Sequence, residues 1–238
     1  MNRDLLSGMT VKEKQFYEDL MKYEDQNFRV LPNVLIKCKN GFYSQIDFVL
    51  VTSSGIFVIE YKGKPAKVYG GEYKDWTCYY GHKKEKFHNP ILQNDRHVKK
   101  LDYALSTSGL HCLEKSVIVF PNDAELDKID FVDSILHENE VISYIKKFPI
   151  VEYDIDLIVK TILSLNITDP IARNAHIENA KKVNLREHVV TIGSTIDVVI
   201  NILGEPLSIS EAEPIILKYE DFSVYFDSNS KVSSLRLS

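Results

Sequence analysis

The sequence lacks the features that mark several large classes of protein. Its 238 residues include three cysteines, Cys38, Cys78 and Cys112, which are well separated and form no CxxC pair, so neither a disulfide framework nor a zinc cluster is predicted. No stretch approaches the roughly 20 apolar residues that a membrane helix needs, and the start has no continuous apolar segment typical of a secretory signal. We therefore expect a soluble cytoplasmic protein with no membrane partner.

A strong charge of either sign is also absent. The 29 Lys and Arg residues nearly balance the 34 Asp and Glu residues, which gives a net charge of −5. A nucleic-acid partner would therefore have to meet a local basic surface rather than a global field. The 44% hydrophobic and 26% charged residues are ordinary for a globular chain, and the length fits one large domain or one with a small appendage.

Hydrophobic periodicity predicts an α/β fold. Residues 10–26 show apolar side chains at helical spacing after Thr10, a suitable N-cap. A three-stranded meander is predicted next, with strands at 34–38, 45–51 and 56–63 and turns at 39–41 and 52–55. Because the last two strands are apolar on both faces, we expect a mixed central β-sheet flanked by helices.

The rest of the chain predicts a second, smaller unit. Before it, the pattern indicates a helix at 91–108, a buried strand at 115–121 and helices at 134–148 and 154–166. A boundary is placed in the polar stretch 169–182, giving a domain over 1–170 and a small α+β domain over 184–238.

Two acidic residues stand inside the apolar strands. Asp47 and Glu60 would be costly to bury without partners. If the hairpin is centred between Ser53 and Ser54, Asp47 faces Glu60 across the strands, and alternation puts Lys62 on the same face.

Such a group suits metal-assisted chemistry. Two neighbouring carboxylates repel each other unless they share a proton or bind a divalent cation, and hard cations such as Mg²⁺ or Mn²⁺ suit oxygen ligands. An adjacent ammonium can orient an attacking water and stabilise charge on a phosphate, so these parts fit phosphodiester hydrolysis. The alternative is that Glu60 and Lys62 are solvated residues near a strand end, with Asp47 satisfied by backbone donors.

The same residues carry a family resemblance. The segment Gln45-Ile-Asp47, the run Gly55-Ile-Phe-Val-Ile-Glu60-Tyr-Lys62, Trp76, and Asn89-Pro90-Ile-Leu-Gln93 with His97 together resemble the nuclease-related domain (NERD), a branch of the PD-(D/E)xK nucleases, over about residues 8–145. The resemblance implies a four-stranded mixed sheet, Asp47 and Glu60 as Mg²⁺ ligands, Lys62 as the catalytic lysine, and Gln93 and Glu13 as helix-borne supports. The glycine that often precedes the acidic helix position is missing before Glu13.

The sequence therefore predicts a Mg²⁺-dependent nuclease, a phosphodiester hydrolase with DNA as the expected substrate. Two alternatives remain: a non-cleaving module on the same fold that binds nucleic acid or protein, and a structural protein whose C-terminal unit is the working surface. The most basic window holds Lys83, Lys84 and Lys86, and with Trp76, Tyr79 and Tyr80 nearby it could contact nucleic acid. That window could equally be a solvated hairpin tip.

The C-terminal unit has no acid pair and no phosphate loop. It resembles the small modules of the outer-membrane assembly lipoprotein and β-lactamase-inhibitor-like class, which bind protein surfaces. A protein partner at 184–238 is therefore a hypothesis, beside that of a plain packing module.

Overall fold

The computed structural model describes residue 6 and residues 8–37, 43–72, 75–129, 133–176, 192–203, 206–210, 214–219 and 222–237. The predicted turn at 39–41 and residues 184–191 of the predicted C-terminal unit lie outside these ranges. The chain divides into two compact units, residues 1–169 and 170–238. Within the described ranges, no helix is both long and apolar enough to cross a membrane.

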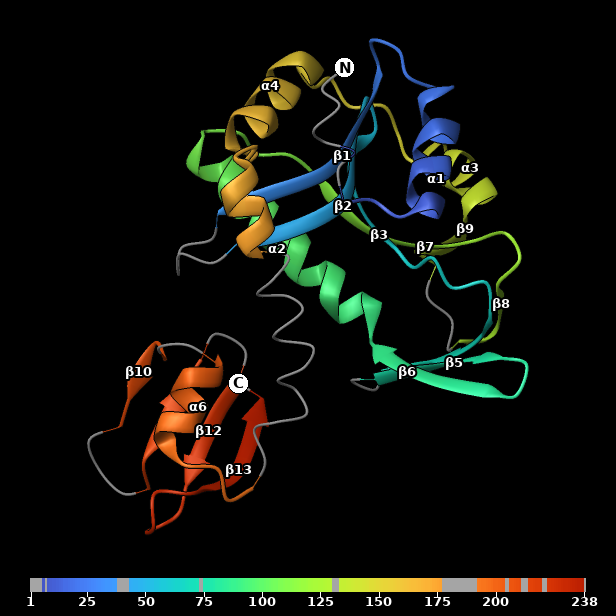
Figure 1. Ribbon diagram of the computed structural model, residues 1–238. Coiled ribbons are helices and arrows are strands. Elements are labelled where there is room, and N and C mark those ends of the chain that lie inside the picture. Colours follow the sequence, from blue (N-terminus) through green and yellow to red (C-terminus); the bar gives the residue numbers. More distant parts are fainter. Residues whose placement is uncertain are drawn as a thin grey trace. The chain divides into compact units, whose positions relative to one another are not determined.

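The first unit is built on a five-stranded sheet that helices cover on both faces (Figure 1). Its strand order is β1-β2-β3-β7-β9; β1, β2 and β3 run antiparallel, and β3, β7 and β9 run parallel. Helices α1 and α3 pack on one face, and α2 and α4 on the other. The bounds are α1 Val11–Met21, β1 Phe28–Lys37, β2 Tyr43–Thr52, β3 Gly55–Tyr61, α2 Pro90–Thr107, β7 Glu114–Phe120, β9 Ile135–His137, α3 Val141–Ile145 and α4 Ile155–Leu165.

Local signals in the sequence explain where these elements begin. Thr10 and Glu13 form a reciprocal capping box at the start of α1. Asn89 caps α2 through a hydrogen bond from the Ile91 amide, and Pro90 occupies the first turn, where its missing N–H has no partner to lose. The predicted mixed α/β fold, with a central sheet covered on both sides, is confirmed.

The region 134–148 differs from the predicted helix. Residues Ile135–His137 form β9, Glu138–Glu140 form the 3₁₀ turn η2, and only Val141–Ile145 are α-helical. The Ile118 amide donates to the Ser134 carbonyl at 2.8 Å, and β9 pairs with β7. The sheet therefore has five strands, whereas the family resemblance implies four. Tertiary pairing here overrides the helical spacing of the apolar residues.

A second, four-stranded sheet lies in the same unit, in the order β6-β5-β4-β8. The basic window with Lys83, Lys84 and Lys86 is the edge strand β6 rather than a hairpin tip, because the chain turns before it, at Gly81 and His82. The bounds are β4 Lys67–Gly70, β5 Asp75–Tyr80, β6 Lys83–His88 and β8 Glu125–Ile129.

Trp76 anchors this second sheet and restricts its neighbour Gly70. The indole is 1% exposed and its Nε1 donates to the Gly71 carbonyl at 3.0 Å. A methyl group on Gly70 would lie 2.4–2.7 Å from the indole ring, closer than carbon atoms can approach. Only a glycine therefore fits under this rigid ring.

Gly70→Ala is expected to lower the free energy of unfolding by about 1–3 kcal/mol, the usual cost of overpacking. Trp76 is the single tryptophan of the chain, so its fluorescence during denaturant unfolding reports this unit. Gly81→Asn is the control, because nothing lies near Gly81 and asparagine tolerates its φ of +60°. Equal stability of Gly70→Ala and wild type would contradict the tight packing.

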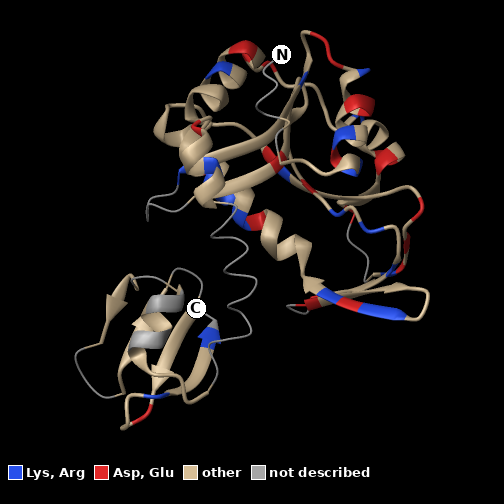
Figure 2. Ribbon diagram, in the orientation of Figure 1, with Lys and Arg blue, Asp and Glu red and all other residues tan. Residues whose placement is uncertain are grey.

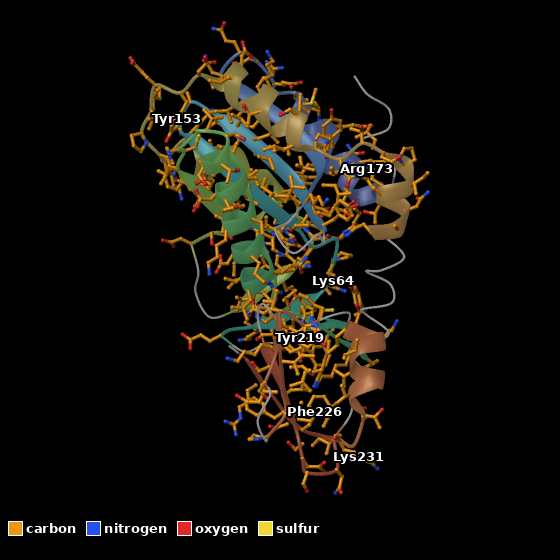
Figure 3. The ribbon with its side chains drawn as sticks, turned by 90° about the vertical axis from the view of Figure 1, so that its left-hand side faces the viewer. Lys64, Tyr153, Arg173, Tyr219, Phe226 and Lys231 are labelled. Atoms are coloured by element: carbon orange, nitrogen blue, oxygen red, sulfur yellow. The ribbon has the colours of Figure 1, made fainter. Side chains whose placement is uncertain are left out.

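The second unit is a small α+β module with an antiparallel four-stranded sheet, order β10-β11-β12-β13. Its core gathers Val199, Leu217, Val224, Phe226 and Val232. Figure 3 labels Phe226 inside this unit and Lys231 near the turn that joins its last two strands. The bounds are α6 Ile196–Leu203, β10 Ser208–Ile209, β11 Ile216–Lys218, β12 Phe222–Phe226 and β13 Val232–Leu237.

Candidate active site

The β2–β3 hairpin has the register that the sequence predicts. The pairs run from Thr52 with Gly55 to Phe48 with Ile59, so the turn is centred between Ser53 and Ser54. One step further along this register lie Asp47 and Glu60. The hairpin therefore brings the two acids to the same end of the sheet.

Glu60 is buried and joined to Lys62. The glutamate is 3% exposed, and its Oε1 accepts a hydrogen bond from Lys62 Nζ at 2.6 Å. The same ammonium donates to Gln93 Oε1 at 2.9 Å, which links β3 to the first turn of α2. Three of the predicted site residues, Glu60, Lys62 and Gln93, are thus in direct contact. Strand alternation places the first two, and the capped start of α2 places the third.

Asp47 lies just beyond the last β2–β3 pair, Phe48 with Ile59, and contacts β3 through its side chain. Its Oδ2 accepts a hydrogen bond from the Tyr61 amide at 2.8 Å. Burial raises the pKa of Asp47 well above its ordinary value, and the negative charge of Glu60 raises it further. Lys62 opposes both effects, so the two carboxylates and the ammonium form one electrostatic unit.

Glu60 is shifted in the same direction. Burial is the main cause of its raised pKa, while the charge and the hydrogen bond of Lys62 lower it. The negative charge of Glu13 raises the pKa of both site acids, although the Glu13 carboxylate itself accepts a hydrogen bond from the Thr10 amide at 2.5 Å. Glu13 therefore acts on the site through space while it caps α1.

His97, which the sequence analysis gave no role beyond its place in the family resemblance, is a neighbour of the acids. Its Nδ1 lies 3.5 Å from Glu60 Oε2, and its side chain is 12% exposed. The available signal was its position four residues after Gln93, on the same face of α2.

The oxygen atoms of this group suit a hard divalent cation. Glu60 Oε2 is buried and accepts no hydrogen bond from any described residue, a costly state for a carboxylate oxygen. The described ranges contain no set of three or more His, Cys, Asp or Glu residues placed to hold a metal. The residues here that could hold Mg²⁺ are Asp47 and Glu60, since proteins commonly bind this cation through one or two carboxylates and leave its other positions to water.

The three predicted nucleic-acid lysines lie apart from this group, on β6 (Figure 2). All three are exposed, but they do not share a face. Lys84 and Lys86 stand opposite Tyr79 and Thr77, whereas Lys83 stands opposite Tyr80 and so on the other face of the sheet.

Comparison with known proteins bears on the same residues. The family model for the nuclease-related domain matches residues 10–121, a range that contains every candidate site residue but is shorter than the resemblance in the sequence suggests. An uncharacterized protein of Bacillus anthracis, pXO1-01, is 28% identical over 173 residues, which cover 70% of this chain and 80% of that protein. No solved structure matches the chain.

Proposed function

The chain carries a nuclease-related domain over residues 10–121, and we propose that it is a metal-dependent nuclease that hydrolyses phosphodiester bonds in DNA. One observation carries the proposal. Buried Glu60 is held by Lys62 through one oxygen, and its other oxygen accepts no hydrogen bond from a described residue, although His97 Nδ1 lies 3.5 Å from it. The charge of Glu60 raises the pKa of its neighbour Asp47, so the two acids belong to one site.

Asp47 and Glu60 would hold Mg²⁺ or Mn²⁺. When bound there, the cation would lower the pKa of a coordinated water and neutralise charge on the scissile phosphate. The Tyr61 amide fixes the Asp47 carboxylate, and the Glu60 contact fixes the ammonium of Lys62.

Lys62 would act on the water and the phosphate. Its ammonium is held by two acceptors, Glu60 and Gln93, and its side chain is 17% exposed, so a donor of three N–H bonds has capacity left for substrate. A fixed positive charge at this position stabilises the additional negative charge of the transition state. Gln93 is a positioning residue in this scheme, because it acts through Lys62.

The non-cleaving alternative explains less of this geometry. A module that only binds gains nothing from two crowded carboxylates with raised pKa values, since their repulsion and burial destabilise the fold. A function that uses both acids at once accounts for that cost.

The test is cleavage of supercoiled, linear duplex and single-stranded DNA and of RNA, with Mg²⁺, Mn²⁺ or EDTA. We expect metal-dependent cleavage of DNA by the wild type and a loss of at least about 100-fold in Asp47→Asn and Glu60→Gln. Glu18→Gln, an exposed carboxylate on α1, is the control purified in parallel.

Cleavage that persists in EDTA or in both acid variants would refute the proposal. Cleavage of RNA but not of DNA would support the metal-dependent hydrolysis and overturn the assignment of DNA as the substrate.

A further inference from the structure

The second sheet has one face covered by the core and one face that the core does not use. Trp76 and Cys78 of β5 point to the covered side with Val68 of β4 and Phe87 of β6. Because side chains alternate along a strand, the intervening residues point to the opposite side. Cross-strand pairs place these residues: Tyr79 with Lys84, Thr77 with Lys86, Tyr69 with Thr77, and Tyr69 with Lys128. Tyr79 also pairs with Lys67, whose ammonium forms an ion pair with Glu125 on the same face.

We name this set the tyrosine–lysine face: Tyr69, Thr77, Tyr79, Lys84, Lys86 and Lys128. Two aromatic rings lie side by side on it. The rings of Tyr69 and Tyr79 are 5.4 Å apart at 72°, and Tyr69 is 39% exposed. Tyr79 is half-buried. Rings that are at least partly exposed on a sheet offer surfaces on which other flat rings can stack.

The positive charge of this face is partly uncompensated. Lys84 lies over the Tyr79 ring at 5.8 Å, and no described acidic side chain lies within ion-pair distance of Lys84 or Lys86. The nearby acids already have cations: Glu125 pairs with Lys67, Asp75 with His88, and Asp127 with Lys128. Figure 2 shows the basic stretch along β6.

We propose that the tyrosine–lysine face binds single-stranded nucleic acid, with bases stacked on Tyr69 and Tyr79 and phosphates next to Lys84 and Lys86. Both parts of the ligand are matched, since unpaired bases stack on aromatic rings while lysines neutralise phosphates. Bases in a duplex are stacked on one another and cannot reach these rings. The proposed nuclease would therefore act on single-stranded substrate. The proposal rests on the proposed nuclease function, because only cleavage gives the bound strand a use.

The strand that carries Lys84 and Lys86 is connected to the candidate active site. β6 ends at His88, and only Asn89 separates it from α2, whose first turn carries Gln93. Lys64, two residues after Lys62, also forms an ion pair at 2.5 Å with Glu85 of β6, which pairs with Cys78 and so lies on the covered side of the sheet. The strand itself, rather than the tyrosine–lysine face, is thus tied at two points to elements of the site.

Binding is measured with the full chain in EDTA, where the proposed cleavage cannot consume the probe. The probes are a fluorescent oligothymidylate and a duplex of the same length, read by anisotropy at several salt concentrations. We expect tighter binding of the single strand and a loss of about tenfold or more for Tyr79→Ala and for Tyr69→Ala. Tyr79→Phe keeps the ring and is expected to bind as the wild type does.

The lysines have a matched control on the same strand. Lys84→Gln with Lys86→Gln is expected to weaken binding and to reduce the slope of log K against log salt by about 0.7 for each phosphate that is no longer neutralised. Lys83→Gln removes an equally exposed charge from the opposite face and should bind as the wild type. Circular dichroism confirms that each variant folds.

Equal affinity for duplex and single strand, unchanged binding in the tyrosine variants, or an equal loss in Lys83→Gln would each overturn the proposal. If the variants change binding as expected but the protein cleaves no nucleic acid, the nuclease function would be refuted. The tyrosine–lysine face would then remain as a binding surface. Cleavage of single strands with unchanged binding by all face variants would refute the face alone.

Discussion

Lys62→Met is expected to slow DNA cleavage by about 10²- to 10⁴-fold, the range usually lost with a group that transfers a proton or stabilises transition-state charge. Methionine keeps an unbranched side chain of nearly the same length but removes the ammonium that contacts Glu60 at 2.6 Å and Gln93 at 2.9 Å. The rate is measured by single-turnover cleavage at saturating Mg²⁺, so that a weaker metal affinity does not lower it.

The matched control is Lys64→Met. Lys64 follows Lys62 by two residues and is similarly buried, but its ammonium pairs with Glu85 and lies over the Phe87 ring at 5.1 Å instead of contacting the site acids. We expect Lys64→Met to cleave DNA at close to the wild-type rate. Similar losses in the two variants would point to a general effect of charge on substrate binding, and full activity of Lys62→Met would remove Lys62 from the mechanism.

Loss of the Lys62 ammonium also changes the two acids. Glu60 would keep a buried carboxylate without its cation, and its raised pKa would rise further. In Lys62→Met, we expect Asp47 and Glu60 to share one proton, because this removes the repulsion between their two negative charges. The ammonium therefore lowers the pKa of both acids, in addition to the role that we propose for it at the substrate.

Much of this site could be predicted from the sequence because it depends on local geometry. A two-residue turn fixes the hairpin register, which ends at the pair Phe48 and Ile59, and the next residues along the two strands are Asp47 and Glu60. Gln93 was predicted only through the family resemblance, since nothing in its spacing shows which strand its helix packs against.

The parts that sequence reasoning missed depend on long-range pairing. Tyr69 joins Tyr79 only because β4 pairs with β5, and Lys128 joins them through a parallel, irregular pairing of β4 with β8. β9 is three residues long, too short to show alternation, and its place is set by β7. Trp76 was grouped with residues that could stack on bases, but it is buried in the core of the second sheet.

Glu114→Gln is expected to stabilise the protein above pH 7 and to leave its stability unchanged near pH 4. Glu114 begins β7, and its buried Oε1 accepts no hydrogen bond within the described ranges. Burial is the main cause that raises the pKa of Glu114 from 4.5 to about 7, with a further increase from the charge of Asp102; Lys115 partly opposes it. The native state therefore prefers the protonated carboxyl.

The sign follows from the protons bound in each state. Between pH 4.5 and about 7 the native state keeps a proton on Glu114 that the unfolded chain has lost, so the free energy of unfolding falls as the pH rises. At about 1.4 kcal/mol for each pH unit, the fall amounts to at most about 3.5 kcal/mol. A glutamine cannot ionise, so Glu114→Gln should avoid this loss and exceed the wild type by up to about 3.5 kcal/mol at pH 8.

Denaturant unfolding followed by Trp76 fluorescence, at pH values from 4 to 8, measures the difference between the two proteins. The raised pKa values of Asp47 and Glu60 impose a pH dependence of their own, but it is common to both proteins and cancels in the difference. Glu152→Gln, an exposed residue outside the sheets, should follow the wild type at every pH. A difference between Glu114→Gln and wild type that is constant with pH would mean that the carboxyl acts through its shape or hydrogen bonding, because only an ionisation that differs between native and unfolded states makes the gain grow with pH.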